Sequence, residues 1–114
     1  MSEAIQRAMC RKYGAAYLAS PRDMKIGISG NVGTGLWPIN GLRHTPEGCT
    51  TGWYVWVGQE LSTACDFFSP LHVSHLRARC PEVEKYLGLG PGWRFIFDET
   101  YEDVWFDELL LSVS

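Results

Sequence analysis

A strand in the middle of the chain is the clearest element that the pattern of apolar and polar residues predicts. Residues 52–58 read Gly-Trp-Tyr-Val-Trp-Val-Gly, so an extended backbone would place apolar side chains on both faces. One face would carry Trp53, Val55 and Val57, and the other Tyr54 and Trp56. Aromatic and β-branched residues between two glycines are typical of a strand covered on both sides. We therefore expect the domain to be built around this strand.

An amphipathic helix is predicted ahead of the central strand, from Ser2 to near Ala19. Apolar residues recur there at every fourth position, which gives the helix one apolar stripe. The members of this stripe are Ile5, Met9, Tyr13 and Tyr17. Pro21 ends the pattern, because proline cannot continue a helix. Residues 25–29 then predict a short strand with both of its isoleucines on one face.

Residues 30–51 show no regular apolar period. Glycine and proline interrupt this stretch too often for long helices or strands. Asn40-Gly41 is a favoured turn dipeptide, so it predicts a hairpin turn between residues 37–39 and 42–44. Irregular stretches of this length inside a compact domain are usually functional, or else ordered by packing.

Two short helices are predicted after the central strand. Ser69 followed by Pro70 is typical of a helix start, so the first helix should run from Pro70 to about Arg79. Pro81 opens the second helix, and Gly88 is a suitable C-terminal stop for it.

An antiparallel hairpin is predicted from residues 93–97 and 103–106, which are rich in aromatic and β-branched residues. We expect this hairpin to pack beside the central strand, and residues 109–113 to form a final strand or a tail. The predicted fold class is therefore α+β. It has a mainly antiparallel sheet, an N-terminal amphipathic helix, and two short helices between the central strand and the C-terminal hairpin.

Length and composition predict one domain that spans residues 1–114. The chain holds five Trp, five Tyr and five Phe, which is enough aromatic volume for a sizeable core. Charged residues interrupt the first twenty positions, which argues against a secretory signal, and the longest apolar run, residues 53–57, is too short to cross a membrane. We therefore expect a cytoplasmic protein that does not bind membranes and whose four cysteines are reduced thiols.

Charge is divided unevenly along the chain. Up to Gly58, six Lys/Arg meet three Asp/Glu, a balance of +3; from Gln59 onward, four Lys/Arg meet ten Asp/Glu, a balance of −6. Proteins that bind nucleic acids normally carry a basic excess, so the net charge of −3 disfavours DNA or RNA as a partner.

Many short segments of the chain together resemble a known family. The first half carries Tyr13-Gly14-Ala15, Lys25-Ile26-Gly27-Ile28, Trp37-Pro38-Ile39-Asn40-Gly41-Leu42-Arg43-His44 and Thr51-Gly52-Trp53-Tyr54-Val55-Trp56. The second half carries Asp66-Phe67-Phe68, Pro70-Leu71-His72-Val73, His75-Leu76, Cys80-Pro81-Glu82-Val83, Tyr86-Leu87-Gly88-Leu89, Pro91-Gly92-Trp93-Arg94-Phe95 and Tyr101-Glu102-Asp103-Val104-Trp105-Phe106-Asp107. Over nearly the whole chain these segments resemble the bacterial immunity-protein thirty-three family. The resemblance implies a non-enzymatic protein that neutralises a cognate toxin of a polymorphic or contact-dependent secretion system.

Residues 98–108, which we call the acidic segment, hold six carboxylates and no Lys or Arg. One interpretation is a solvated sheet edge whose charges prevent pairing with neighbouring sheets. The other is a surface that steers a basic partner, such as the substrate groove of a nuclease toxin, and repels wrong partners. The candidate toxin-binding residues are Glu99, Glu102, Asp103, Asp107 and Glu108.

Cys65, His72, His75 and Cys80 have a composition that zinc accepts. Their spacing matches no structural zinc pattern, and Leu71 and Leu76 would share a helix face with the histidines. We therefore expect two partly buried, hydrogen-bonded histidines, with no metal and no cofactor.

Motifs for catalysis are weak. Ser29 lies in a sequence close to a nucleophile elbow, but Asn31 replaces the last glycine of that motif. The glycines of residues 30–35 lack the lysine of a phosphate loop, and nothing in the sequence activates Cys49 with His44 as a thiol and base pair. We expect no enzyme.

Tryptophans suggest an alternative function. Trp37, Trp53 or Trp93 could form a stacking platform for a glycan or another small molecule, which would make the chain a ligand-binding domain. Trp105 could be a core residue or an interface anchor, and we expect it in the core.

Overall fold

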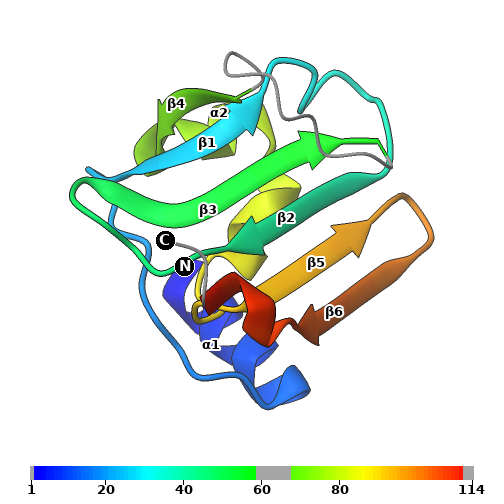
Figure 1. Cartoon of the computed structure of the whole chain (residues 1–114). Helices are drawn as coiled ribbons and strands as arrows, with labels where there is room; N and C mark the ends of the chain where they lie inside the picture. Colours follow the sequence, from blue (N-terminus) through cyan, green and yellow to red (C-terminus); the bar gives the residue numbers. More distant parts are fainter. Residues whose placement is uncertain (1, 59–67, 112–114) are drawn as a thin grey trace.

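A computed structural model of the chain describes residues 2–58 and 68–111. These residues form a six-stranded sheet of order β4-β1-β3-β2-β5-β6 (Figure 1). The strands are β1 (Lys25–Ser29), β2 (Ile39–Arg43), β3 (Thr50–Val57), β4 (Phe68–His72), β5 (Trp93–Phe97) and β6 (Glu102–Phe106). The helices are α1 (Ser2–Tyr13) and α2 (Leu76–Arg79), with 3₁₀ turns η1 (Val73–His75), η2 (Pro81–Tyr86) and η3 (Glu108–Leu111). Of the paired strands described, β1 and β3 run parallel and the other pairs antiparallel, which confirms a mainly antiparallel α+β fold.

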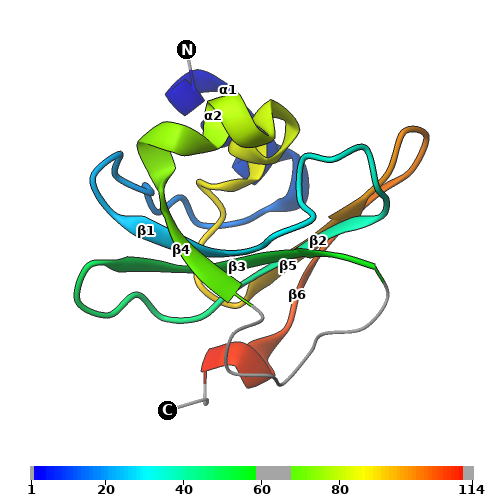
Figure 2. The same ribbon diagram turned by 90° about the horizontal axis from the view of Figure 1, so that it is seen from above.

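Helical elements lie on both faces of the sheet. Figure 2 shows α1 and α2 on one face, and the red turn of η3 on the other. The main core fills the space beneath α1, α2 and η2 and contains Trp53, Val55 and Phe95. A smaller core on the opposite face joins Leu42 and Trp56 to Leu110 of η3.

β3 is the central strand that the sequence predicts. It lies between β1 and β2, and its two sets of side chains enter different cores. Trp53 and Val55 are fully buried in the main core, with Val57 packed against it, whereas Trp56 is buried in the smaller core. Both predicted faces of the strand are therefore confirmed.

α1 ends earlier than the predicted Ala19. Gly14 follows Tyr13 with φ +72°, and the Ala15 amide donates to the Cys10 carbonyl at 2.9 Å, a left-handed stop that suits glycine. The predicted stripe is also displaced. Ile5 is exposed, whereas Cys10 is buried because α1 packs its neighbouring face against η2. The residues buried on that face are Gln6, Met9 and Cys10.

The predicted turn at Asn40-Gly41 is wrong, because both residues lie in the middle of β2. The ring of Phe95 on β5 crosses Gly41 so closely that a Cβ atom there would lie 2.1 Å from the ring. Asn40 is held by its side-chain amide, which donates to the Gly58 carbonyl at 2.6 Å. Gly41 is thus required by close packing between neighbouring strands and not by a turn.

The predicted helix over residues 70–79 is wrong in its first three residues. Residues 68–72 form β4, which pairs with β1, and helical turns begin only at Val73. Phe68 packs edge-on against Tyr54 with ring centroids 5.1 Å apart, so tertiary packing holds the segment extended. Pro70 lies in an edge strand, where proline is tolerated.

The C-terminal predictions hold in outline. The second short helix is the 3₁₀ turn η2, which opens with Pro81. β5 and β6 form the predicted antiparallel hairpin, but β5 pairs with β2, so β2 separates the hairpin from the central strand. Instead of a final strand, residues 108–111 form η3, and the remainder of the predicted 109–113 element lies outside the described residues.

Arg43, at the end of β2, is a buried charge that joins several loops. Its guanidinium donates to the carbonyls of Thr51 and Leu18 at 2.8 Å, and its planar group lies over the Trp53 ring. Further bonds go to the carbonyls of Ala19, Leu87 and Leu89. Burial lowers the pKa of Arg43 to about 10. The segment after α1 and the one after η2 are therefore fixed to the sheet by a single side chain.

Candidate functional site

The acidic segment begins in the turn between β5 and β6, where Asp98 stabilises the backbone. Its carboxylate accepts hydrogen bonds from the amides of Thr100 and Tyr101, both at 2.8 Å. The Asp98 amide in turn donates to the Tyr101 carbonyl at 2.9 Å. The Asp98 carboxylate is thus used within the turn, which it stabilises by bonding to the backbone of residues 100 and 101.

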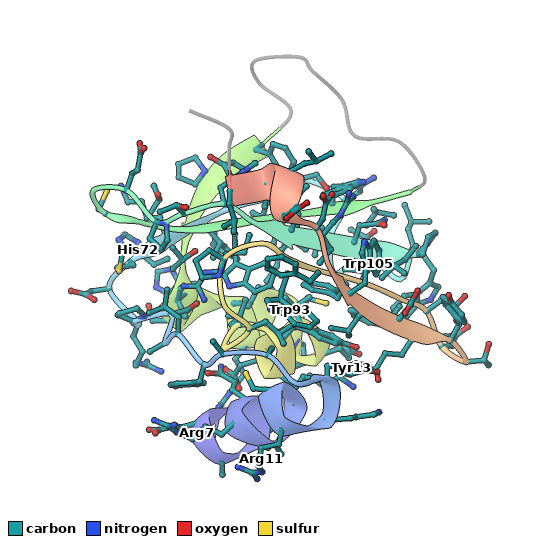
Figure 3. The ribbon with its side chains drawn as sticks, turned by 60° about the horizontal axis from the view of Figure 1, so that its bottom comes forward. Arg7, Arg11, Tyr13, His72, Trp93 and Trp105 are labelled. Atoms are coloured by element: carbon teal, nitrogen blue, oxygen red, sulfur yellow. The ribbon has the colours of Figure 1, made fainter. Side chains whose placement is uncertain are left out.

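Glu102, at the start of β6, is held by side chains from two other elements. Its carboxylate accepts hydrogen bonds from the hydroxyls of Tyr13 on α1, at 3.0 Å, and Tyr86 on η2. It also forms ion pairs with Lys12 and Lys85, each at 3.3 Å. Tyr13, labelled in Figure 3, therefore lies where α1 approaches β6.

These contacts shift the pKa values of Glu102 and of the two tyrosines that bond to it. Burial alone would raise the pKa of Glu102, but the hydrogen bonds, led by that from Tyr86, outweigh it and hold this pKa at about 2. Burial, and then the bond to the Glu102 carboxylate, raise the pKa of Tyr86 and of Tyr13. Glu102 is thus a fixed anion that fastens α1 and η2 to the hairpin, although the sequence predicts it as a toxin-binding residue.

Asp107 also has internal partners. Its carboxylate forms an ion pair with Arg94 on β5 at 3.2 Å and accepts a hydrogen bond from the Leu109 amide at 3.1 Å. The Asp107 carbonyl accepts from the Leu110 amide at 3.1 Å. Asp107 therefore connects the end of β6 to η3.

The other candidate carboxylates, Glu99, Asp103 and Glu108, are exposed. None of the three takes part in an ion pair with another residue of segments 2–58 and 68–111. Exposed apolar residues alternate with them: 55% of Tyr101 and 47% of Phe106 are accessible. The structure thus divides the acidic segment into carboxylates with internal partners and carboxylates directed to solvent.

Trp105 is not a core residue as expected. It belongs to neither buried cluster. Its half-buried ring packs against the Arg94 guanidinium, whose Cζ atom lies 5.3 Å from the centre of the ring. An aromatic side chain in this position, beside exposed carboxylates, has the composition of an interface anchor.

His72 of the candidate zinc group ends β4, at the opposite edge of the sheet from β6, as the labels of His72 and Trp105 in Figure 3 show. His72 and His75 have ring centroids 5.9 Å apart, and both are exposed, contrary to the expected partial burial, because His72 ends an edge strand. Cys80 is buried, and this burial together with the neighbouring Glu82 carboxylate raises the pKa of its thiol to about 11. Cys65 lies outside the described residues. Among residues 2–58 and 68–111, no three His, Cys, Asp or Glu side chains are grouped to hold a metal ion.

The candidate nucleophiles have ordinary local roles. The Ser29 hydroxyl donates to the Asn31 side chain at 2.8 Å. The His44 ring pairs with the Leu110 carbonyl at 3.1 Å and packs edge-on against Tyr54, while Cys49 is an exposed free thiol. Ser29 and His44 are thus held by local contacts that stabilise the fold.

Of the three tryptophans proposed as alternative stacking platforms, Trp53 is ruled out because it is 1% exposed and its indole donates to the Leu87 carbonyl, whereas Trp37 and Trp93 are half-buried. Trp37 is half-buried and lines a groove of about 250 Å³ with Leu36 and Cys80. Ligand pockets usually exceed 300 Å³, so this groove is small for a glycan.

Comparison with known families supports the resemblance noted in the sequence. The model of the Imm33-like domain matches residues 5–107. The chain belongs to the Imm33-like family. No significant match is found among curated proteins or among solved structures.

The Imm33-like region contains most of the elements described above, from α1 to the end of β6. Of the exposed carboxylates in the acidic segment, Glu99 and Asp103 fall within it, and Glu108 follows it directly. No helix in residues 2–58 and 68–111 is both long and apolar enough to cross a bilayer.

Proposed function

We propose that this Imm33-like protein is a cytoplasmic immunity protein that binds a cognate bacterial toxin and covers its active surface, without catalysing a reaction itself. Membership of the Imm33-like family supports a protein toxin as the partner. The hypothesis needs a binding surface on a folded domain and requires no catalytic group, cofactor or nucleic acid.

We place the toxin-binding surface at the exposed carboxylates of the acidic segment. Residues 95–114 contain six acidic residues and no Lys, Arg or His. Lys12, Lys85 and Arg94 pair with two of these carboxylates, so three cations meet six acids and the hairpin end of the molecule keeps a negative balance. Glu99 and Asp103 form no ion pair with a described residue, and a basic toxin surface would supply a partner for them. Tyr101, Trp105 and Phe106 add the aromatic area on which protein interfaces depend.

Glu102 and Asp107 contribute to this surface differently. Their carboxylates are already bound by Lys12, Lys85 and Arg94, so they shape the hairpin and leave little charge for a partner. Among the sequence-predicted residues, we therefore assign direct toxin contact to Glu99, Asp103 and Glu108.

Co-expression with the toxin encoded by the adjoining gene tests the proposal. We expect growth to be restored and the toxin to co-purify with the immunity protein in a stable complex. Continued toxicity together with the absence of a complex would show that this chain does not neutralise that toxin.

A further inference from the structure

β6 forms one edge of the sheet, because β5 is its neighbour on one side and no described strand pairs with the other side (Figure 1). An edge strand presents backbone N–H and C=O groups that another strand can bind. Two hydrogen bonds beside the ends of β6 show which of its backbone groups face outward. The Asp98 amide donates to the Tyr101 carbonyl at 2.9 Å, and the Asp107 amide donates to the Gly92 carbonyl at 2.7 Å.

Hydrogen-bonded pairs alternate with non-bonded pairs along an antiparallel ladder. Since the 98–101 and 92–107 pairs are bonded, the register places bonded pairs at 96–103 and 94–105. The backbone groups of Asp103 and Trp105 therefore point to β5. Those of Glu102, Val104 and Phe106 point away from the sheet, as a row of three donor and acceptor positions to which no backbone group of residues 2–58 and 68–111 bonds.

The opposite edge of the sheet is blocked at the corresponding position. On β4, the Val73 amide donates to the Met24 carbonyl at 2.9 Å, so the register with β1 turns the backbone of residues 68, 70 and 72 outward. Pro70 occupies the middle one of these positions and has no N–H to offer. β6 has no proline, so the two edges differ in whether they can accept a strand.

The surroundings of β6 indicate the chemistry of its partner. Phe106 is 47% exposed at the end of the strand and Tyr101 is 55% exposed before it, so an added strand would find apolar contacts at both ends. Asp103 and Glu99 are exposed nearby. A second copy of this chain would bring a like-charged edge against them, whereas a strand with Lys or Arg would be attracted.

We propose that the toxin adds a strand with basic side chains to the outer edge of β6, where it bonds to the backbone of Glu102, Val104 and Phe106. The inference rests on the proposed function and specifies its binding mode. Backbone bonds would provide affinity, and Asp103 with Glu99 would select the basic partner.

Hydrogen exchange measured residue by residue by NMR tests this binding mode on the unmodified protein. In the free protein, the amides of Glu102, Val104 and Phe106 should exchange faster than those of Asp103 and Trp105. With the toxin domain from the adjoining gene bound, the outward amides should become at least about tenfold slower. Binding of the toxin without this protection would overturn strand addition and leave the immunity function intact. Absence of any binding would overturn both proposals.

A matched pair of variants separates backbone from side-chain contributions. Phe106→Pro and Phe106→Ala both remove the aromatic ring, but only proline removes the outward amide hydrogen. We expect Phe106→Pro to bind the toxin about tenfold more weakly than Phe106→Ala. Equal affinity of the two variants, with both folded by circular dichroism, would contradict strand addition.

Discussion

Replacing Glu102 by glutamine should destabilise the fold in a way that depends on pH. The substitution keeps the size of the side chain but removes the charge that Lys12, Lys85 and the two tyrosines bind. Because these contacts join α1 and η2 to β6, their loss should reduce the free energy of unfolding of the whole domain.

The magnitude follows from the pKa of Glu102. The shift from its ordinary value of 4.5 to about 2 corresponds to about 3 kcal/mol at about 1.4 kcal/mol per pKa unit. The carboxylate is 23% exposed, so solvent screens part of this, and we expect about 2 to 3 kcal/mol. Since small domains are stable by only about 5 to 15 kcal/mol, the effect is a large fraction of the total.

The sign of the pH dependence is determined by the direction of the shift. Glu102 has a lower pKa in the folded than in the unfolded chain, so its stabilisation is complete above about pH 4.5 and is lost as pH falls towards 2. The difference in unfolding free energy between wild type and Glu102→Gln should therefore be largest at pH 7 and shrink steadily below pH 4.5.

Urea denaturation of both proteins at several pH values measures this difference. Asp103→Asn is the control, because Asp103 is an exposed neighbour with no ion pair to a described residue and should change stability by less than about 0.5 kcal/mol. A Glu102→Gln effect that is the same at pH 7 and pH 3, or no larger than that of the control, would refute the structural role of Glu102.

Three further substitutions, one of them paired with the control Gly30→Ala, test the packing of the fold by thermal denaturation. Arg43→Ala should lower stability by at least about 3 kcal/mol, because it removes a buried guanidinium that donates to five backbone carbonyls, of which that of Leu87 also accepts from Trp53 and Ser20. A smaller effect would show that water replaces the guanidinium. Gly41→Ala should lower stability by about 1 to 3 kcal/mol, because its Cβ would lie 2.1 Å from the Phe95 ring. The control Gly30→Ala should be nearly neutral, because nothing lies within 4 Å of its Cβ. Equal effects of the two substitutions would contradict the close packing of Gly41 against Phe95. Gly14→Ala should cost about 1 kcal/mol because φ there is +72°, and a stabilised variant would mean that α1 can continue.

The sequence is sufficient to predict those elements whose local pattern agrees with their tertiary surroundings. Residues 25–29, the central strand and the C-terminal hairpin are confirmed, because alternating or two-sided apolar patterns leave an extended backbone as the favourable state. Asn40-Gly41 misleads because a turn and a close strand crossing both need glycine. Ser69-Pro70 misleads because a helix start and an edge strand both accept proline.

The sequence locates the acidic segment, but it does not show which of its carboxylates have partners in the fold. The sequence alone shows that residues 98–108 are acidic. It does not show that Glu102 meets Lys12 and Lys85, which are 90 and 17 positions away, and it gives no sign that Arg43 is buried. Such partners become visible only when distant segments are brought together in the fold.

The association rate constant with the cognate toxin is the most direct test of an acidic binding surface. We compare wild type with Glu99→Lys/Asp103→Lys and with a control pair, Asp23→Lys/Glu47→Lys, which changes the net charge equally at exposed positions outside the acidic segment. The first pair should slow association about tenfold or more at low salt, and the difference should shrink as salt rises. Equal rate constants for the two variant pairs, or rates that do not depend on salt, would contradict the proposal that this surface binds the toxin.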